Sequence, residues 1–238
     1  MRTFARFCFA ALAFFSATAR ADDGTQVYFD HHELNYIGDL KKDANAKLFA
    51  LYDSLPEKPT TLLIRSGGGE ILTGMELGKW IHDHHLDVKV LEYCASSCAN
   101  YVFPAGAHKI VSNFALIGFH GGASSVSFKF DEKTQAMLDS LPAQQRDAIL
   151  ADMKKDQEKW VAQEVEFFKT IGVRQEVTTV GQQPKYQKLM DRDPSTQVWT
   201  YAPEDFARFG IGSITVINPP WKPAKPSKKL GFETLPLD

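Results

Sequence analysis

The sequence has little cysteine, little excess charge and no apolar run long enough for a membrane span. Its 238 residues include three cysteines, and the formal net charge is −2 at pH 7. Such a weakly acidic balance argues against a nucleic acid or an anionic membrane surface as partner. The apolar stretch from Phe7 to about Phe15 is short, because a spanning helix needs about 20 residues.

The first residues have the pattern of an export signal. Arg2 and Arg6 give a positive start, the apolar stretch follows, and Ala19-Arg20-Ala21 is a small-x-small cleavage site. We therefore expect a signal peptide over residues 1–21, a mature chain that begins near Asp22 and a periplasmic location. No stable membrane insertion is expected after processing, and an uncleaved anchor is the alternative.

Export would leave Cys94 and Cys98 as the only cysteines of the mature chain, since Cys8 lies in the leader. An oxidising compartment favours a disulfide between them, and two small thiols packed under a helix are the alternative. The bridge would close a very short loop. We therefore expect it to fix local geometry more than global stability.

The order of the expected elements predicts an α/β fold with a largely parallel sheet. Short apolar segments indicate strands, and clusters of helix formers or apolar residues at helical spacing indicate helices. Alternation of the two implies parallel strands with right-handed crossovers. The expected strands are Thr25–Asp30, Thr61–Arg65, Val88–Tyr93, Lys109–Val111, Ala115–Phe119 and Ile214–Ile217, and the expected helices include Ala44–Leu55, Ile71–His82, Ala99–Phe103 and Ala202–Phe209.

The chain is expected to hold one α/β domain over residues 22–217, without internal repeats. Residues 131–171 are rich in helix formers and are broken by Pro142, so we expect a helical insertion over about 128–190. Residues 218–238 are rich in proline and lysine, which predicts an extended tail.

Two short segments carry the candidate chemistry. Residues 64–70 (IRSGGGE) form a glycine-rich turn between a strand and a helix, and residues 94–99 (CASSCA) place a serine where another strand meets a helix. His120 follows at the end of a third strand-like run. A histidine that takes the serine proton and free backbone N–H groups that stabilise an oxyanion are the parts that acyl transfer needs.

The segment from about Thr60 to Gly122 resembles the proteolytic subunit of the Clp protease. A weaker similarity returns at Pro203–Ile211. The wider group includes signal peptide peptidase A and the crotonase-like enzymes. The matching features are Ser66, Gly68, Gly69, Gly74 and Met75 in the strand–turn–helix, with Gly67 in place of a proline, residues 93–99 in the nucleophile segment, and residues 103–106 (FPAG) before the histidine.

The resemblance implies a crotonase-like spiral of βαβ units and a serine peptidase site. By position it makes Ser97 the nucleophile and His120 the general base. It makes the backbone N–H groups of Gly69 and Cys98 the oxyanion hole.

The resemblance also implies an aspartate that orients His120. Asp193 is the first choice and Asp191 the alternative, although both lie farther from Gly210 than the family pattern expects. A different partner for His120 is left open.

The leading hypothesis is a periplasmic serine peptidase-like hydrolase that acts on peptide or protein substrates without a cofactor, a metal or an ATPase. A non-catalytic binding protein that kept the fold is the alternative. Crotonase-like thioester chemistry is less favoured, because it uses the oxyanion hole without a serine. A homo-oligomer is left open.

Other polar and aromatic clusters have simpler interpretations. His82-Asp83-His84-His85 lacks separated ligands and is expected to be a solvated helix end, and the same holds for His31-His32. Glu164 and Glu166 are expected on a solvated helix face. We expect three aromatic residues to pack against the core or to form an oligomer surface: Trp160, Phe167 and Phe168.

Overall fold

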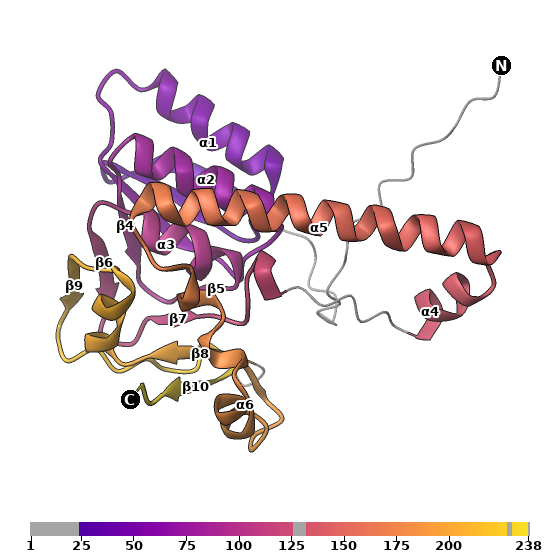
Figure 1. The fold of residues 1–238 in the computed structure, drawn as a ribbon. Helices are drawn as coiled ribbons and strands as arrows, with labels where there is room; N and C mark the ends of the chain where they lie inside the picture. Colours follow the sequence, from indigo (N-terminus) through magenta and orange to yellow (C-terminus); the bar gives the residue numbers. More distant parts are fainter. Residues whose placement is uncertain (1–23, 126–131, 228–229, 238) are drawn as a thin grey trace.

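A central six-stranded sheet organises the protein, for which the computed structural model describes residues 24–125, 132–227 and 230–237 (Figure 1). β1 is antiparallel to β2, and every other neighbouring pair is parallel. The expectation of an α/β fold with a largely parallel sheet is therefore confirmed. The strand order is β1 (Gln26–Asp30), β2 (Glu33–Ile37), β3 (Thr61–Arg65), β4 (Asp87–Val90), β6 (Lys109–Ser112) and β9 (Ile214–Ile217).

Two helices, α1 (Lys42–Ser54) and α2 (Ile71–Asp83), make the crossovers between β2, β3 and β4. Alternate residues of each strand point to opposite faces of a sheet, so one apolar set per strand can be buried. Leu62 and Ile64 of β3 are both fully buried, whereas the residues between and beside them keep partial exposure. The helices contribute their own apolar faces to the same core.

A second group of strands positions the residues of the candidate site. The expected strand Val88–Tyr93 is two strands, because the chain leaves the central sheet after β4 and resumes as β5 (Tyr93–Ala95). β5 pairs in parallel with β7 (Leu116–Gly118). A bridge between Ser66 and Cys94 joins β5 to the end of β3, and a bridge between Phe119 and Trp199 leads on to β8 (Thr196–Tyr201).

Short helical elements follow β5 and β7. The expected buried helix after β5 consists of a π-helical turn, η1 (Cys98–Val102), continued by α3 (Phe103–Ala105). A short 3₁₀ turn, η2 (Ala123–Ser125), follows β7. Further 3₁₀ turns are η3 (Gln175–Thr178), η4 (Val180–Gln182) and η5 (Pro203–Phe209).

The expected helical segment contains α4 (Glu132–Asp139), α5 (Ala143–Ile171) and α6 (Pro184–Met190). Pro142 separates α4 from α5, as its fixed φ and missing N–H predict. The first part of α5 and α4 extend away from the body of the protein (Figure 1), whereas Phe167 and Phe168 near the end of α5 are buried beside Tyr101. These two phenylalanines therefore pack into the core.

The segment after β9 is not a free extended tail. Trp221 is buried, stacks on Phe206 and donates a hydrogen bond of 2.8 Å from its indole nitrogen to the Ala115 carbonyl. Farther on, β10 (Gly231–Leu235) pairs in parallel with β8. The expected extended tail is therefore wrong for Trp221 and for β10, which pack on the folded domain. The high proline and lysine content of this segment gave no indication of these apolar contacts.

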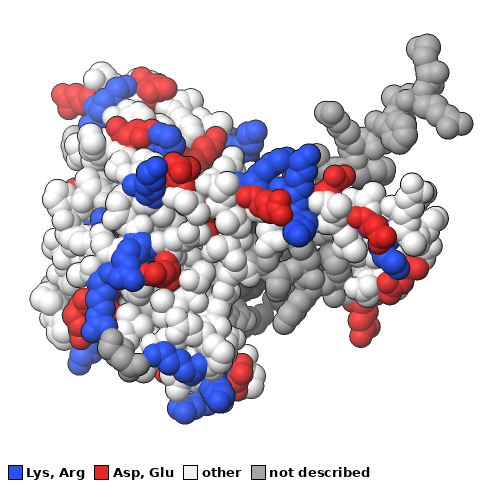
Figure 2. All heavy atoms as spheres, in the orientation of Figure 1, with Lys and Arg blue, Asp and Glu red and all other residues white. Residues whose placement is uncertain are grey.

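Charges are mixed over the face shown in Figure 2, where Lys and Arg side chains lie among Asp and Glu side chains.

Within the described ranges, no helix combines the length and apolar character needed to cross a membrane. The expected signal peptide, its cleavage site and Cys8 lie outside the described residues.

Candidate active site

A serine and a histidine meet at the ends of β5 and β7. The parallel register pairs Ala95 with Gly118, and the Ser96 N–H donates to the Gly118 carbonyl at 2.8 Å. The side chains that follow the two strands therefore lie close together. His120 Nε2 and Ser96 Oγ are 2.6 Å apart, which is a short hydrogen bond.

Ser96 occupies a sharp turn between β5 and η1. Its φ is +56°, in the left-handed region that non-glycine residues rarely adopt. Such conformations cluster at active sites, and a strained strand-to-helix turn exposes the nucleophile in hydrolases. Ser96 is half-buried, and His120 beside it is exposed.

The expectation that Ser97 faces His120 is wrong by one residue. Ser97 is only 3 % exposed, and its hydroxyl donates to the Gly69 carbonyl at 2.7 Å. Its backbone already has helical angles, whereas the positive φ turns Ser96 toward His120. Sequence reasoning missed Ser96 because two adjacent serines carry no local signal that tells them apart.

The glycine-rich turn lies directly against Ser96. Gly68 has a φ of +99°, and its N–H donates to Ser66 Oγ at 3.1 Å. A Cβ on Gly68 would lie 2.6 Å from the Cβ of Ser96 and 2.9 Å from its Oγ. Only glycine leaves room for this close approach.

Two backbone N–H groups are available near the serine. Gly69 is exposed, and among the described residues its N–H has no hydrogen-bond acceptor. Ser97 stands at the beginning of η1, where backbone N–H groups have no partner within the helix. With Ser96 as the nucleophile, the donor that follows it is the N–H of Ser97 rather than that of Cys98.

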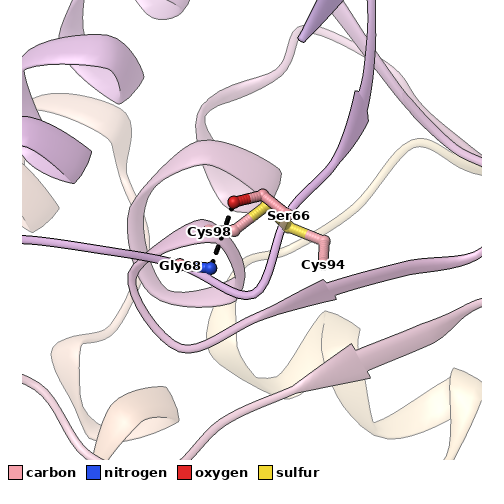
Figure 3. The surroundings of a disulfide bond; sticks show 4 residues. All are labelled: Ser66, Gly68, Cys94 and Cys98. Carbon is pink, nitrogen blue, oxygen red and sulfur yellow. Dashed lines mark hydrogen bonds between the residues drawn. A yellow bond between two sulfur atoms is a disulfide. The ribbon is translucent and has the colours of Figure 1, made fainter. Parts of the chain in front are cut away.

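A disulfide joins Cys94 to Cys98 across this turn, as the sequence predicts (Figure 3). The two Cα atoms are 5.3 Å apart, and both cysteines are fully buried. Cys94 belongs to β5 and Cys98 to η1, so the bridge spans the turn that holds Ser96. Ser66 and Gly68 lie beside the bridge in Figure 3. The bridge therefore restrains the backbone on both sides of Ser96.

The environment of His120 favours a neutral imidazole. Desolvation lowers the pKa of His120 from its usual value of 6.5, and a hydrogen bond with its own backbone opposes the shift. A neutral ring can accept the serine proton at neutral pH. In addition, the side-chain amide of Gln182 lies 3.5 Å from the His120 carbonyl.

The expected third member of a triad is not in place. Asp193 accepts a hydrogen bond of 2.8 Å from the Ser195 N–H and lies 3.3 Å from Lys225 Nζ. Hydrogen bonds from Ser195 and then Lys225 lower the pKa of Asp193. Asp191 is exposed at the end of α6, and no carboxylate in the described ranges, Asp191 included, is bonded to His120. The expectation failed because the chain between α6 and β8 directs Asp193 toward the C-terminal segment.

We expect Asp193→Asn, Asp191→Asn and the double variant to keep kcat/KM within about threefold of the unchanged protein, because surface changes away from a site have small effects. Steady-state hydrolysis of a p-nitrophenyl ester measures this. His120→Ala supplies the reference for a lost base. If the double variant lost as much kcat/KM as His120→Ala, one of the two aspartates would have to act in catalysis.

The histidine-rich end of α2 has exposed members, with His84 bonded to the Trp80 carbonyl. In the part of the chain that the structure describes, no three His, Cys, Asp or Glu side chains are grouped as metal ligands would be.

Comparison with known proteins does not assign the chain to a family. No family model matches the chain, and no curated protein matches it either.

Proposed function

We propose that this protein is a serine hydrolase that uses Ser96 as nucleophile and His120 as general base. The observation that carries the proposal is the 2.6 Å contact between Ser96 Oγ and His120 Nε2. It occurs at a strained strand-to-helix turn beside a glycine-rich loop. Nucleophile, base and backbone donors in one place are the requirements of acyl transfer.

The reaction follows from these positions. Ser96 Oγ forms a bond to the substrate carbonyl carbon while its proton passes to His120 Nε2. The N–H groups of Gly69 and Ser97 are the proposed donors to the oxyanion. The bond to the leaving group then breaks, and the leaving group takes the proton from His120. A water molecule then attacks the acyl carbon while His120 takes its proton, and the bond to Ser96 Oγ breaks as His120 passes that proton to the serine oxygen.

A dyad fits the electrostatics of the site. An acid partner would stabilise imidazolium and raise the pKa of the histidine, whereas the pKa of His120 is lowered. The ring is thus neutral and able to accept a proton, but no carboxylate among the described residues is bonded to it to stabilise the imidazolium formed during attack. Loss of the aspartate role costs about 10⁴-fold in a triad, so we expect slow turnover.

Peptide or protein substrates and a crotonase-like spiral are further parts of the proposal. They come from the resemblance of residues 60–122 to the Clp protease subunit. The sequence of parallel strands, the glycine-rich turn after β3 and the histidine after β7 support them. We propose ATP-independent activity in the periplasm. The leader-like residues 1–21 and the Cys94–Cys98 bridge support this location, because disulfides persist in oxidising compartments.

A fluorophosphonate probe tests the proposal, because it forms a stable bond only with an activated serine. We expect one label per chain, placed on Ser96 by mass spectrometry of the modified peptide. Ser96→Ala and His120→Ala should each abolish labelling. Absence of a label on the folded, oxidised protein would contradict the proposal.

The labelling rate also reports the state of His120. Only the neutral imidazole accepts the serine proton, so the rate should rise with pH through the pKa of His120. Because that pKa is lowered, we expect the midpoint below 6.5. Ser96→Ala measured at each pH corrects for background reaction. A midpoint above 6.5 would indicate a carboxylate partner instead.

A non-catalytic binding protein is the second candidate. The absence of a carboxylate bonded to His120 in the described residues favours it. This candidate predicts that the folded protein remains unlabelled by the probe but retains a peptide ligand.

A further inference from the structure

Glu164 of α5 is a buried carboxylate that the proposed chemistry does not use. The sequence places it on a solvated helix face, but it is 0 % exposed, whereas Glu166 on the same helix is exposed. Four donors surround its two oxygens. They are Tyr101 Oη at 2.7 Å, the Ala123 N–H at 2.9 Å, the Ser124 N–H at 3.0 Å and Gln175 Nε2 at 2.6 Å.

A buried charge is costly unless hydrogen bonds replace its water. The pKa of Tyr101 is raised well above its usual value, mainly by burial and secondly by the negative charge of Glu164. Tyr101 therefore stays protonated and donates a hydrogen bond to Glu164. Hydrogen bonds to an ionised acceptor are stronger than neutral ones. Glu164 therefore fixes the groups that donate to it.

Two of those donors belong to the segment that follows His120. Ala123 and Ser124 lie in η2, three and four residues beyond the histidine. Gly122 is pressed so closely against Glu164 Oε1 that a Cβ there would collide with the carboxylate. The end of α5 thus bonds to and packs against the loop that directly follows His120.

The same loop is tied to η1, the helical turn that follows Ser96. Asn100 donates from Nδ2 to the Gly121 carbonyl at 2.6 Å, and Tyr101 from the same turn donates to Glu164. Asn100 also bonds through its N–H to the Ser96 carbonyl at 2.9 Å. Hydrogen bonds therefore connect Glu164 to both members of the Ser96–His120 pair.

We propose that Glu164 is a positioning residue whose carboxylate orders the loop of residues 121–125 and thereby holds His120 in hydrogen-bond contact with Ser96. The inference rests on the proposed function for its catalytic consequence. The orientation of His120 can be measured even if the protein shows no hydrolysis.

The test compares Glu164→Gln with Glu166→Gln. The first change keeps the size of the side chain but removes its charge and turns one acceptor oxygen into a donor that faces other donors. The second makes the same chemical change two residues along α5, at an exposed side chain. Two readouts are used: the Nε2 resonance of His120 in protein labelled with ¹⁵N-histidine, and kcat and KM for a p-nitrophenyl ester.

We expect the His120 Nε2 resonance of Glu164→Gln to move toward its position in Ser96→Ala, where the contact is absent. We also expect kcat to fall about 10- to 100-fold with little change in KM, since misplacement of a catalytic group by about 1 Å costs about 10²-fold. Glu166→Gln should match the unchanged protein in both readouts. All measurements are made below the melting temperature of each variant.

An unchanged His120 resonance in folded Glu164→Gln would overturn the inference. If that variant does not fold, Tyr101→Phe removes one donor and keeps the ring, and a smaller shift in the same direction is expected. An unchanged resonance in folded Tyr101→Phe would then overturn it. Should the unchanged protein show no hydrolysis, the proposed function fails, but the resonance still decides whether Glu164 positions His120.

Discussion

Replacement of Ser96 by alanine is expected to lower ester and peptide hydrolysis by about 10³-fold or more, because loss of a nucleophile removes the whole acyl-enzyme route. Ser97→Ala is the matched control, since it deletes the same hydroxyl from the adjacent residue. Ser97 contacts the Gly69 carbonyl rather than His120. Its loss should cost about 1 kcal/mol of stability, the usual contribution of one hydrogen bond, and about tenfold or less in rate.

Steady-state kinetics of both variants on one ester panel measures the difference. Thermal melting confirms that each variant is folded. A larger loss in Ser97→Ala than in Ser96→Ala would assign the nucleophile to Ser97 and contradict the geometry of the Ser96–His120 pair. Equal activity of Ser96→Ala and the unchanged protein would remove serine catalysis altogether.

Gly68→Ala is expected to have the second largest effect. The residue has a φ of +99°, and a Cβ there would lie 2.6 Å from that of Ser96. The strained backbone and the steric overlap each cost about 1 to 3 kcal/mol, so we expect a loss of about 2 to 6 kcal/mol in the free energy of unfolding. Because the overlap pushes on Ser96, activity should fall by about 10²-fold even in folded protein.

Gly67→Ala provides the control within the same turn. A Cβ on Gly67 meets no atom within 4 Å. Its stability should therefore change by less than about 1 kcal/mol, with activity retained. Urea denaturation and ester hydrolysis are measured for both variants. If Gly68→Ala were as stable and active as Gly67→Ala, the glycine-rich turn would not pack against the nucleophile as described.

Much of the fold follows from local pattern. The strand Thr61–Arg65 and the helix that begins at Ile71 agree with expectation because apolar spacing and flanking glycines act within a few residues. The break at Pro142 is equally local. β2, β8 and β10 were not predicted, although the residues of β8 (TQVWTY) are mostly β-branched or aromatic. The parallel pairing of β8 with β10 joins segments that are distant in the sequence, so no local pattern indicates it.

The features of the candidate site can likewise be separated into those that local sequence predicted and those that tertiary pairing decided. The chemical types, their place at strand ends and the Cys94–Cys98 pairing are readable from the chain, because each depends on neighbours in sequence. The choice of Ser96 over Ser97 depends on one backbone angle and on the register of β5 with β7. That register is decided by pairing between distant segments.

Long-range contacts also decide which charged residues matter. Glu164 lies three and four residues before Phe167 and Phe168 on one face of α5, whereas Asp193 lies in a polar segment, but this spacing alone does not say what Glu164 contacts. The packing of α5 against η1 and η2 buries Glu164 and supplies four donors, whereas Asp193 lies at the surface beside Lys225. Residue types and local elements were thus readable from the chain, but burial and partners, which set the role of a carboxylate, arise only when distant segments pack together.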